Sequence, residues 1–231
     1  MASTVQSSQS SVPASRAEAP PSADEKPSLA GWYGRNRKLV NYVASGIAIL
    51  AVAGWLYLET GRRRQLAGVD ALDRARASFE SGNLPVASTE FQRVAQSFRG
   101  TDAGFAAELA LNEVRLASGQ TQIAADELKK FADNNPPAFF ASGAWMLRGG
   151  ALENLKKYDE AADSYSKAAA IATEDYRKVE AMLGQARAAR LAGKAPQAID
   201  VYRQVIKTFG RTVPGVAEAE VRLAELTKGN S

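Results

Sequence analysis

Two pairs of neighbouring carboxylates come closest to a catalytic pattern in this sequence, Asp159–Glu160 and Glu174–Asp175. Paired acids can work as general acid and general base when a reacting group lies between them and a partner base lies within reach. The sequence places no such base beside either pair. Both pairs stand where helices are predicted to begin, and carboxylates there interact favourably with the helix dipole. We therefore interpret them as helix-start residues.

Other kinds of reactive group are missing. The 231-residue chain contains no His and no Cys, which excludes Ser-His and Cys-His nucleophilic pairs, zinc sites built on those residues, and disulfides. It also contains no glycine-rich phosphate loop. We expect no enzymatic activity, no metal and no cofactor. The absence of Cys is compatible with an oxidising compartment.

The net charge of +4 is concentrated in one short segment. Residues 35–64 carry six Arg or Lys against one Glu, a net of +5, whereas residues 1–34 have a net charge of −1. Residues 65–231 carry 21 basic and 21 acidic side chains, a net of 0. A neutral surface of mixed sign gives no support to phosphate-backbone binding, so we expect no nucleic-acid partner.

The N-terminal part divides into a tail and an apolar segment. Residues 1–34 are rich in Ser, Ala and Pro and are predicted to be a disordered tail, because they offer little apolar surface to bury. Residues 35–64 are predicted to be a transmembrane helix with basic flanks. The segment 39–58 holds 20 residues without a charge, enough to cross a hydrocarbon core of about 30 Å. A buried core helix is the alternative, but such a helix usually shows a polar face.

The flanking charges do not decide how this segment is oriented. Three basic residues precede it (Arg35, Arg37, Lys38) and three follow it (Arg62, Arg63, Arg64), so the positive-inside rule favours neither side. Small residues at helical spacing could let another membrane helix approach closely; they are Ala44, Ala48 and Ala51.

Beyond residue 65 a motif recurs with a period of 37 residues. Its small residues are Ala87, Ala124, Ala161 and Ala198. Four residues after each comes a large apolar or aromatic side chain: Phe91, Leu128, Tyr165 and Tyr202. Five residues before each comes a turn position: Gly82, Gly119, Lys156 and Gly193. A fixed period in this range is typical of a solenoid, in which each small residue lets two helices pack closely.

The third unit resembles the tetratricopeptide repeats. The matching residues are Trp145, Gly149 and Leu152 on its first helix, then Tyr158, Ala161, Tyr165 and Ala168. Arg148 departs from the pattern, which has Leu there. The resemblance implies an all-α fold over residues 65–231, an α-solenoid of four helix pairs. A lone helix over 213–228 is expected to cap its last apolar face.

Such an array would present its first helices on the inner surface. The candidate partner-binding groove there consists of Leu72, Arg76, Leu109, Glu113, Met146, Leu183, Arg187 and Arg190. The four apolar residues have a second interpretation, because periodic apolar stripes usually pack neighbouring helices together. We favour packing for these four and regard the charged residues as the better binding candidates.

The tail, the apolar segment and the repeats together resemble the membrane-anchored ancillary subunits of the bacterial Sec translocon. That resemblance implies a single-pass protein of the inner membrane with its C-terminal domain in the periplasm. The expected partners are the lipid bilayer, through residues 39–58, and proteins or peptides: secreted proteins, periplasmic chaperones or the translocon. An alternative function is a fixed structural accessory subunit that docks into a larger membrane complex through its transmembrane helix.

Overall fold

The computed structural model describes the backbone of residues 29–227, with their side chains except at positions 29–31, 35, 57 and 64. The predicted disordered tail lies outside the described residues over positions 1–28 and stays a prediction there. Its last six residues, 29–34, are helical instead. The sequence boundary followed hydrophobicity, whereas helical hydrogen bonding also extends through polar residues with adequate helix propensity.

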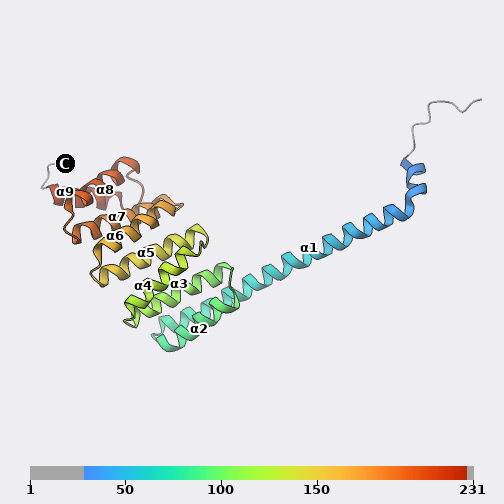
Figure 1. Ribbon diagram of the computed structural model, residues 1–231, viewed down its shortest axis with the longest axis horizontal. Helices are drawn as coiled ribbons and strands as arrows, with labels where there is room; N and C mark the ends of the chain where they lie inside the picture. Colours follow the sequence, from blue (N-terminus) through green and yellow to red (C-terminus); the bar gives the residue numbers. More distant parts are fainter. Residues whose placement is uncertain (1–28, 228–231) are drawn as a thin grey trace, which may run out of the picture. The chain divides into compact units, whose positions relative to one another are not determined.

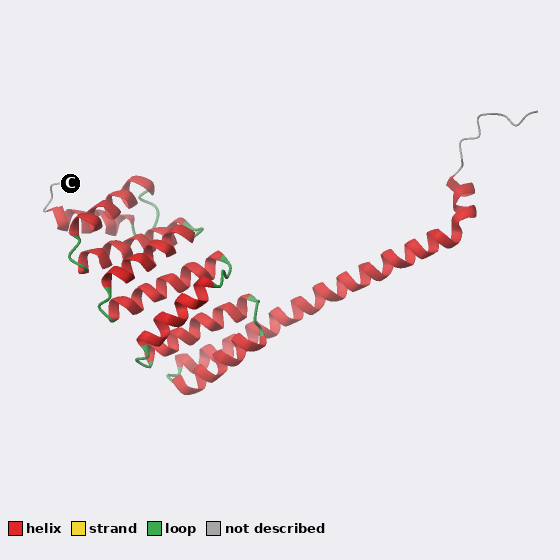
Figure 2. Ribbon diagram, viewed as in Figure 1, coloured by secondary structure: helices red, strands yellow, loops and turns green. Residues whose placement is uncertain are grey.

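Residues 29–227 form nine helices and no strand, as Figure 2 shows. The helices are α1 (Leu29–Glu80), α2 (Leu84–Ser97), α3 (Asp102–Ala117), α4 (Thr121–Asp133), α5 (Ala138–Asn154), α6 (Tyr158–Ile171), α7 (Asp175–Leu191), α8 (Ala195–Thr208) and α9 (Val216–Thr227). Helical backbone geometry is interrupted once within α1, at Asn36.

The chain divides into two compact units between Tyr57 and Leu58. The sequence placed the start of the repeat domain at residue 65, after the Arg cluster. The helix continues through that cluster, and its C-terminal part belongs to the first repeat. A Cβ added to Gly68 of α1, for example, would lie 2.9 Å from Ala103 and 3.1 Å from the Phe98 ring. Composition marks the charge cluster, but packing decides where a domain begins.

In the second unit, consecutive helices pair and stack, as Figure 1 shows for α2 to α9. The C-terminal part of α1 packs on α2 through Leu72, Phe79 and Phe91. The pairs α3–α4, α5–α6 and α7–α8 follow. The predicted helical repeat solenoid is therefore confirmed.

The predicted capping helix is α9, which packs on α8 and buries Val216, Ala219 and Leu223 against the last pair. It begins at Val216, three residues later than predicted. Pro214 and Gly215 precede that start, and Gly215 has a φ of 93°, outside the helical region. Lys228, the last residue of the predicted cap, lies outside the described residues.

The four predicted turn positions all adopt the left-handed backbone conformation. Their φ values are 77° at Gly82, 76° at Gly119, 59° at Lys156 and 77° at Gly193. Each ends its first helix with the same pair of hydrogen bonds: at the second turn, Gly119 N–H donates to Leu116 C=O and Gln120 N–H donates to Arg115 C=O. This is the Schellman motif, in which two orphan carbonyls are satisfied.

The periodic small residues lie in the core. Ala87, Ala124, Ala161 and Ala198 are each 0% exposed. The large residues one helical turn later are buried too, and Tyr165 shows why size matters there. Its ring fits between two glycines of neighbouring first helices: a Cβ would lie 2.6 Å away at Gly149 and 2.8 Å away at Gly184. The helix Tyr158–Ile171 is therefore regular because it packs between α5 and α7.

Within the described residues, α1 is the one helix long and apolar enough to cross a membrane by length and composition, and none of its most apolar stretch is buried. Large apolar side chains such as Ile47 and Leu50 are exposed there. The predicted packing residues Ala44, Ala48 and Ala51 are exposed as well. Their role against another membrane helix stays a prediction.

Candidate protein-binding face

The first helices of the second, third and fourth repeats share one continuous face. A Cβ added to Gly143 of α5 would lie 3.4 Å from Leu109 Cδ1 of α3 and 3.8 Å from Arg177 Nη2 of α7. One glycine thus contacts side chains of both neighbouring first helices. Figure 1 shows these three helices in succession. A face of this kind can contact a partner along several repeats at once.

The apolar residues predicted to line the groove divide into two groups. Leu72 and Leu183 are 5% and 8% exposed and belong to buried clusters. They pack helices together and are removed from the candidate groove. Leu109 and Met146 are half-buried against the core clusters and keep part of their side chains at the surface. The same sequence register therefore has different exposure in different repeats.

Two of the predicted charged residues interact across the first and second repeats. Arg76 is exposed and donates to Asp73 on its own helix at 3.3 Å. Glu113 on α3 lies within the field of Arg76. Desolvation raises the pKa of Glu113 above its usual range, and the positive charge of Arg76 partly opposes that rise. The structure thus places opposite charges on neighbouring first helices.

Arg187 of α7 joins three helices. Its Nε donates to both carboxylate oxygens of Glu153 on α5, at 3.1 and 3.2 Å, and its Nη2 donates to the Tyr165 hydroxyl on α6 at 3.2 Å. Burial, and next the Glu153 charge, raises the pKa of Tyr165, while Arg187 opposes the rise. Arg190, one turn further along α7, is exposed. Arg187 therefore stabilises the stack and remains half accessible to a partner.

Sequence reasoning missed two exposed aromatic residues of this face. Phe139 and Tyr176, which are 37 residues apart, are 51% and 49% exposed near the starts of α5 and α7. The Arg177 guanidinium lies over the Phe139 ring, 4.0 Å from its centroid. Exposed aromatics beside a cation are typical of protein interfaces. The 37-residue period pairs these two positions, so the repeat register itself could have found them.

Three of the four paired carboxylates have structural partners, whereas Glu174 Oε2 is buried without a hydrogen-bond partner. Asp159 and Glu160 lie in the first turn of α6, and Asp175 lies in the first turn of α7, as predicted. Lys194 Nζ lies 2.9 Å from Asp159 Oδ1, and Lys178 Nζ lies 3.5 Å from Asp175 Oδ1. Glu160 faces Arg148 at 3.5 Å. These ion pairs support the interpretation of the pairs as helix-start residues.

The helix pairs stack on one another, and within each pair a residue in the left-handed backbone conformation joins the two helices. This arrangement defines an α-helical repeat scaffold. The tetratricopeptide repeat-like domain family matches residues 58–184, more than half of the chain, and a further tetratricopeptide repeat (TPR) matches residues 180–212. The chain belongs to the tetratricopeptide repeat-like family. Repeats of this family form protein–protein interaction scaffolds and are generally non-catalytic.

Solved structures with the same fold include two other repeat proteins. One contains the nearly identical TPR-like repeats of a Podosopora anserina protein described as a kinesin light chain, with a TM-score of 0.55 and 18% identity over 70% of this chain and 85% of that one. The other is MamA, with a TM-score of 0.52 and 20% identity over 67% of this chain and 83% of that one. Identities this low show the fold alone. No curated protein sequence matches this chain.

Proposed function

We propose that this protein is a membrane-anchored scaffold that uses its tetratricopeptide array to bind protein partners. The proposal rests on two features found together in one chain. The most apolar stretch of α1 is not buried, and the first helices of the repeats form a continuous face. Twenty uncharged residues in one helix span about 30 Å, the thickness of a hydrocarbon core. In water, a patch of this size would be a liability for aggregation. A bilayer removes that exposure.

The proposed partner is a polypeptide, bound on the first-helix face. That face offers the exposed rings of Phe139 and Tyr176, the half-buried Leu109 and Met146, and charges of both signs. Apolar and aromatic groups surrounded by charged side chains are what a protein interface requires. Anchoring would raise the effective concentration of the array for partners near the same membrane.

The proposal places the array on the periplasmic face of a bacterial inner membrane. Its support is the resemblance to ancillary Sec translocon subunits and the absence of Cys, which suits an oxidising compartment. Partners there would be secreted proteins, periplasmic chaperones or a translocon-like complex. Protease added to intact spheroplasts tests the orientation: digestion of a C-terminal tag from outside is expected. Protection of the tag would contradict the periplasmic placement.

Site-specific photo-crosslinking in intact membranes tests partner binding. A photoreactive residue at Phe139 or Tyr176 is expected to give crosslinks to protein partners, because both side chains are exposed on the first-helix face. Val221 on α9 is a matched control, since it is 56% exposed on the capping helix instead. Equal crosslinking at all three positions, or none at any, would count against this face.

A second candidate function is a fixed accessory subunit docked through α1. The exposure of Ala44, Ala48 and Ala51 favours it, because small residues at helical spacing permit close helix packing in a membrane. Replacing residues 39–58 with an unrelated apolar segment separates the two functions. The scaffold proposal expects the crosslinks at Phe139 and Tyr176 to persist. Their loss, with the chain still in the membrane, would favour the accessory subunit.

A further inference from the structure

The third repeat contains an aromatic side chain held in a cation-lined slot. Trp145 of α5 is 7% exposed and packs with Phe131 and Ala132 of α4 and Ala168 of α6. Lys167 Nζ lies 4.4 Å from the centroid of the Trp145 ring. A cation this close to an indole face is attracted by the ring quadrupole. The slot thus combines apolar walls with a cation.

The 37-residue register places an equivalent slot in the second repeat, without the indole. Glu108 of α3 stands where Trp145 stands in the third repeat, and Lys130 of α4 stands where Lys167 stands. Between Ala95, Leu111 and Phe131 the structure has a cavity of about 340 Å³. We call this cavity the second-repeat slot. Ala95 and Phe131 stand where Ala132 and Ala168 stand in the third repeat, and the lysine is kept. Ala95, Leu111 and Phe131 form the apolar part of the wall, and the other nine lining residues are polar or charged.

We propose that the second-repeat slot binds an indole-bearing side chain, a tryptophan of a protein partner. The inference rests on the protein-binding part of the proposed function but not on membrane anchoring. A volume of about 340 Å³ is at the lower end of ligand pockets, which run from about 300 to 1,000 Å³, and suits one large side chain. In the third repeat the chain's own Trp145 fills the slot, and in the second repeat a tryptophan of the partner would fill it.

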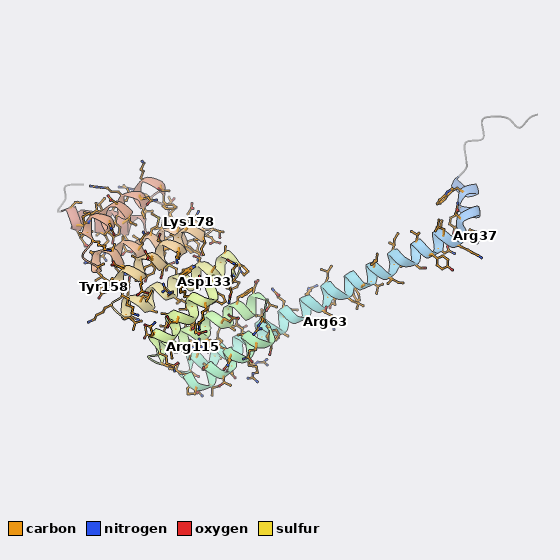
Figure 3. All side chains as sticks on the ribbon, in the orientation of Figure 1. Arg37, Arg63, Arg115, Asp133, Tyr158 and Lys178 are labelled. Atoms are coloured by element: carbon orange, nitrogen blue, oxygen red, sulfur yellow. The ribbon has the colours of Figure 1, made fainter. Side chains whose placement is uncertain are left out.

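The charges of the slot favour a neutral aromatic group over an ion. Lys130 Nζ already lies 2.7 Å from Glu127 Oε1, and Arg115 Nη1 donates to the Asn112 side chain at 2.7 Å. Figure 3 labels Arg115 on α3. With charges of both signs present and partly paired, neither an anion nor a cation meets a large surplus of opposite charge.

Glu108 supplies the polar contact that an indole needs. No described residue donates a hydrogen bond to its carboxylate, and the charge of Arg99 acts on it. A buried indole N–H usually finds an acceptor, and an ionised carboxylate has acceptor sites only. Ala95, Leu111 and Phe131 offer an apolar surface to the ring, Glu108 an acceptor for its N–H and Lys130 a cation for its face, and an indole uses all three.

The fourth repeat has a groove of the same size with different chemistry. Its cavity is also about 340 Å³, with Met182 where Glu108 and Trp145 stand. Gln204 replaces the lysine of the second and third repeats. This groove has no carboxylate, and its one cation, Lys178, comes from α7 and not from the register of Lys130. It is therefore a matched control within the same chain.

The test uses the full-length chain in detergent micelles and, as a probe, N-acetyl-tryptophanamide fluorinated on its ring. Fluorine NMR is expected to show saturable binding, with N-acetyl-leucinamide at least about tenfold weaker as a competitor. Inorganic phosphate and acetate are expected not to compete. Absence of saturable binding, or competition by either anion at the same concentration as the tryptophan amide, would overturn the proposal.

Substitutions locate the bound probe. Glu108→Trp fills the slot from within and is expected to abolish saturable binding, whereas Met182→Trp leaves it unchanged. Lys130→Gln reproduces the fourth repeat and is expected to weaken binding about three- to tenfold, as loss of a cation–π contact should. Wild-type affinity in a folded Glu108→Trp variant would overturn the proposal.

A second measurement needs no substitution. A photoreactive derivative of the same amide, irradiated with the wild-type chain, is expected to label peptides from α2, α3 and α4. Labelling confined to the peptides of α6, α7 and α8 would overturn the proposal even if Glu108→Trp failed to fold. Partner crosslinks at Phe139 and Tyr176 would survive that result, so failure of this inference is distinct from failure of the proposed function.

Discussion

Tyr165 depends on two residues that have no side chain. Alanine at Gly149 would place its Cβ 2.6 Å from the Tyr165 ring, a distance that forces the ring or the helix to shift. We expect Gly149→Ala to lower the free energy of unfolding by about 1–3 kcal/mol, the usual cost of overpacking. Chemical denaturation measures it.

Gly150 provides the control for that substitution. A Cβ there would meet only the Tyr165 hydroxyl, at 3.8 Å. Gly150→Ala should be neutral or stabilising, because alanine is the better helix former. Equal losses of stability in the two variants would show that the slot around Tyr165 is not the cause.

Lys156 is the residue that breaks the glycine pattern of the turns. It has a φ of 59°, where the other three turn positions have glycine. The left-handed region costs a residue with a Cβ about 1–2 kcal/mol. We expect Lys156→Gly to raise the free energy of unfolding by about 0.5–1 kcal/mol, as measured by denaturant titration.

Lys156→Ala separates backbone from side chain at the same position. It removes the charge but keeps the Cβ, so it should leave stability nearly unchanged. If alanine stabilises the protein as much as glycine does, the lysine charge and not the backbone conformation accounts for the gain.

The raised pKa of Glu108 predicts that the stability of the protein depends on pH. Desolvation raises the pKa of its carboxyl above the usual value, and the charge of Arg99 only partly opposes this. The folded state therefore binds the proton more tightly than the unfolded state. Stability falls as pH rises from about 4.5 through the folded pKa and stays lower above it. Arg115, Lys130 and Glu127 also face the slot.

Glu108→Gln removes that ionisation. We expect the variant to be more stable than the wild type at pH 7 and equal to it near pH 4, by denaturant titration at each pH. Glu80→Gln, at the exposed end of α1, is the control for the general effect of removing one carboxylate. A constant difference between the Glu108 variant and the wild type across this range would contradict the assignment.

At the scale of elements, one ion pair reports whether Arg187 has a structural or a binding role. Arg187 on α7 and Glu153 on α5 link two first helices, and the arginine side chain is 47% exposed. Arg187→Glu should destabilise the protein, and adding Glu153→Arg should recover part of the loss. Exposed ion pairs couple by about 0.2–1 kcal/mol, and in this pair Arg187 is half exposed while Glu153 is only 17% exposed. A double-mutant cycle measures this coupling.

Crosslinking in the same variants tests whether Arg187 also binds the partner. If Arg187 also contacts the partner, the swapped pair regains stability but not the crosslinks at Phe139 and Tyr176. Recovery of both would assign Arg187 to packing alone. The 37-residue period could not distinguish packing from partner binding. It places Arg187 on the first-helix face but does not show that Arg187 contacts Glu153 there.

The whole molecule is expected to behave as an integral membrane protein. Its most apolar stretch is unburied, and we propose that lipid covers it. The full-length chain should stay with membranes after an alkaline wash, whereas a chain starting at Leu58, the boundary of the second unit, should be released. Fractionation and immunoblotting measure both. Release of the full-length chain would contradict the anchor.

Several features could be read from the sequence because they depend on local spacing. The 37-residue period identified the buried alanines, the left-handed turns and the capping helix, since helix packing repeats the same small and large residues at the same offsets. The uncharged stretch 39–58 is visible in the same way, because its length and composition alone set the expectation.

Exposure and pairing were decided by the tertiary structure. Leu72, Leu109, Met146 and Leu183 share one register, yet the first and last are buried while the middle two reach the surface. What covers a residue depends on side chains of the neighbouring helices, whose sizes differ from repeat to repeat. Glu108 shows the same effect: it stands at the Trp145 register, but the cavity beside it also depends on Leu111 and Phe131, which replace Arg148 and Ala168.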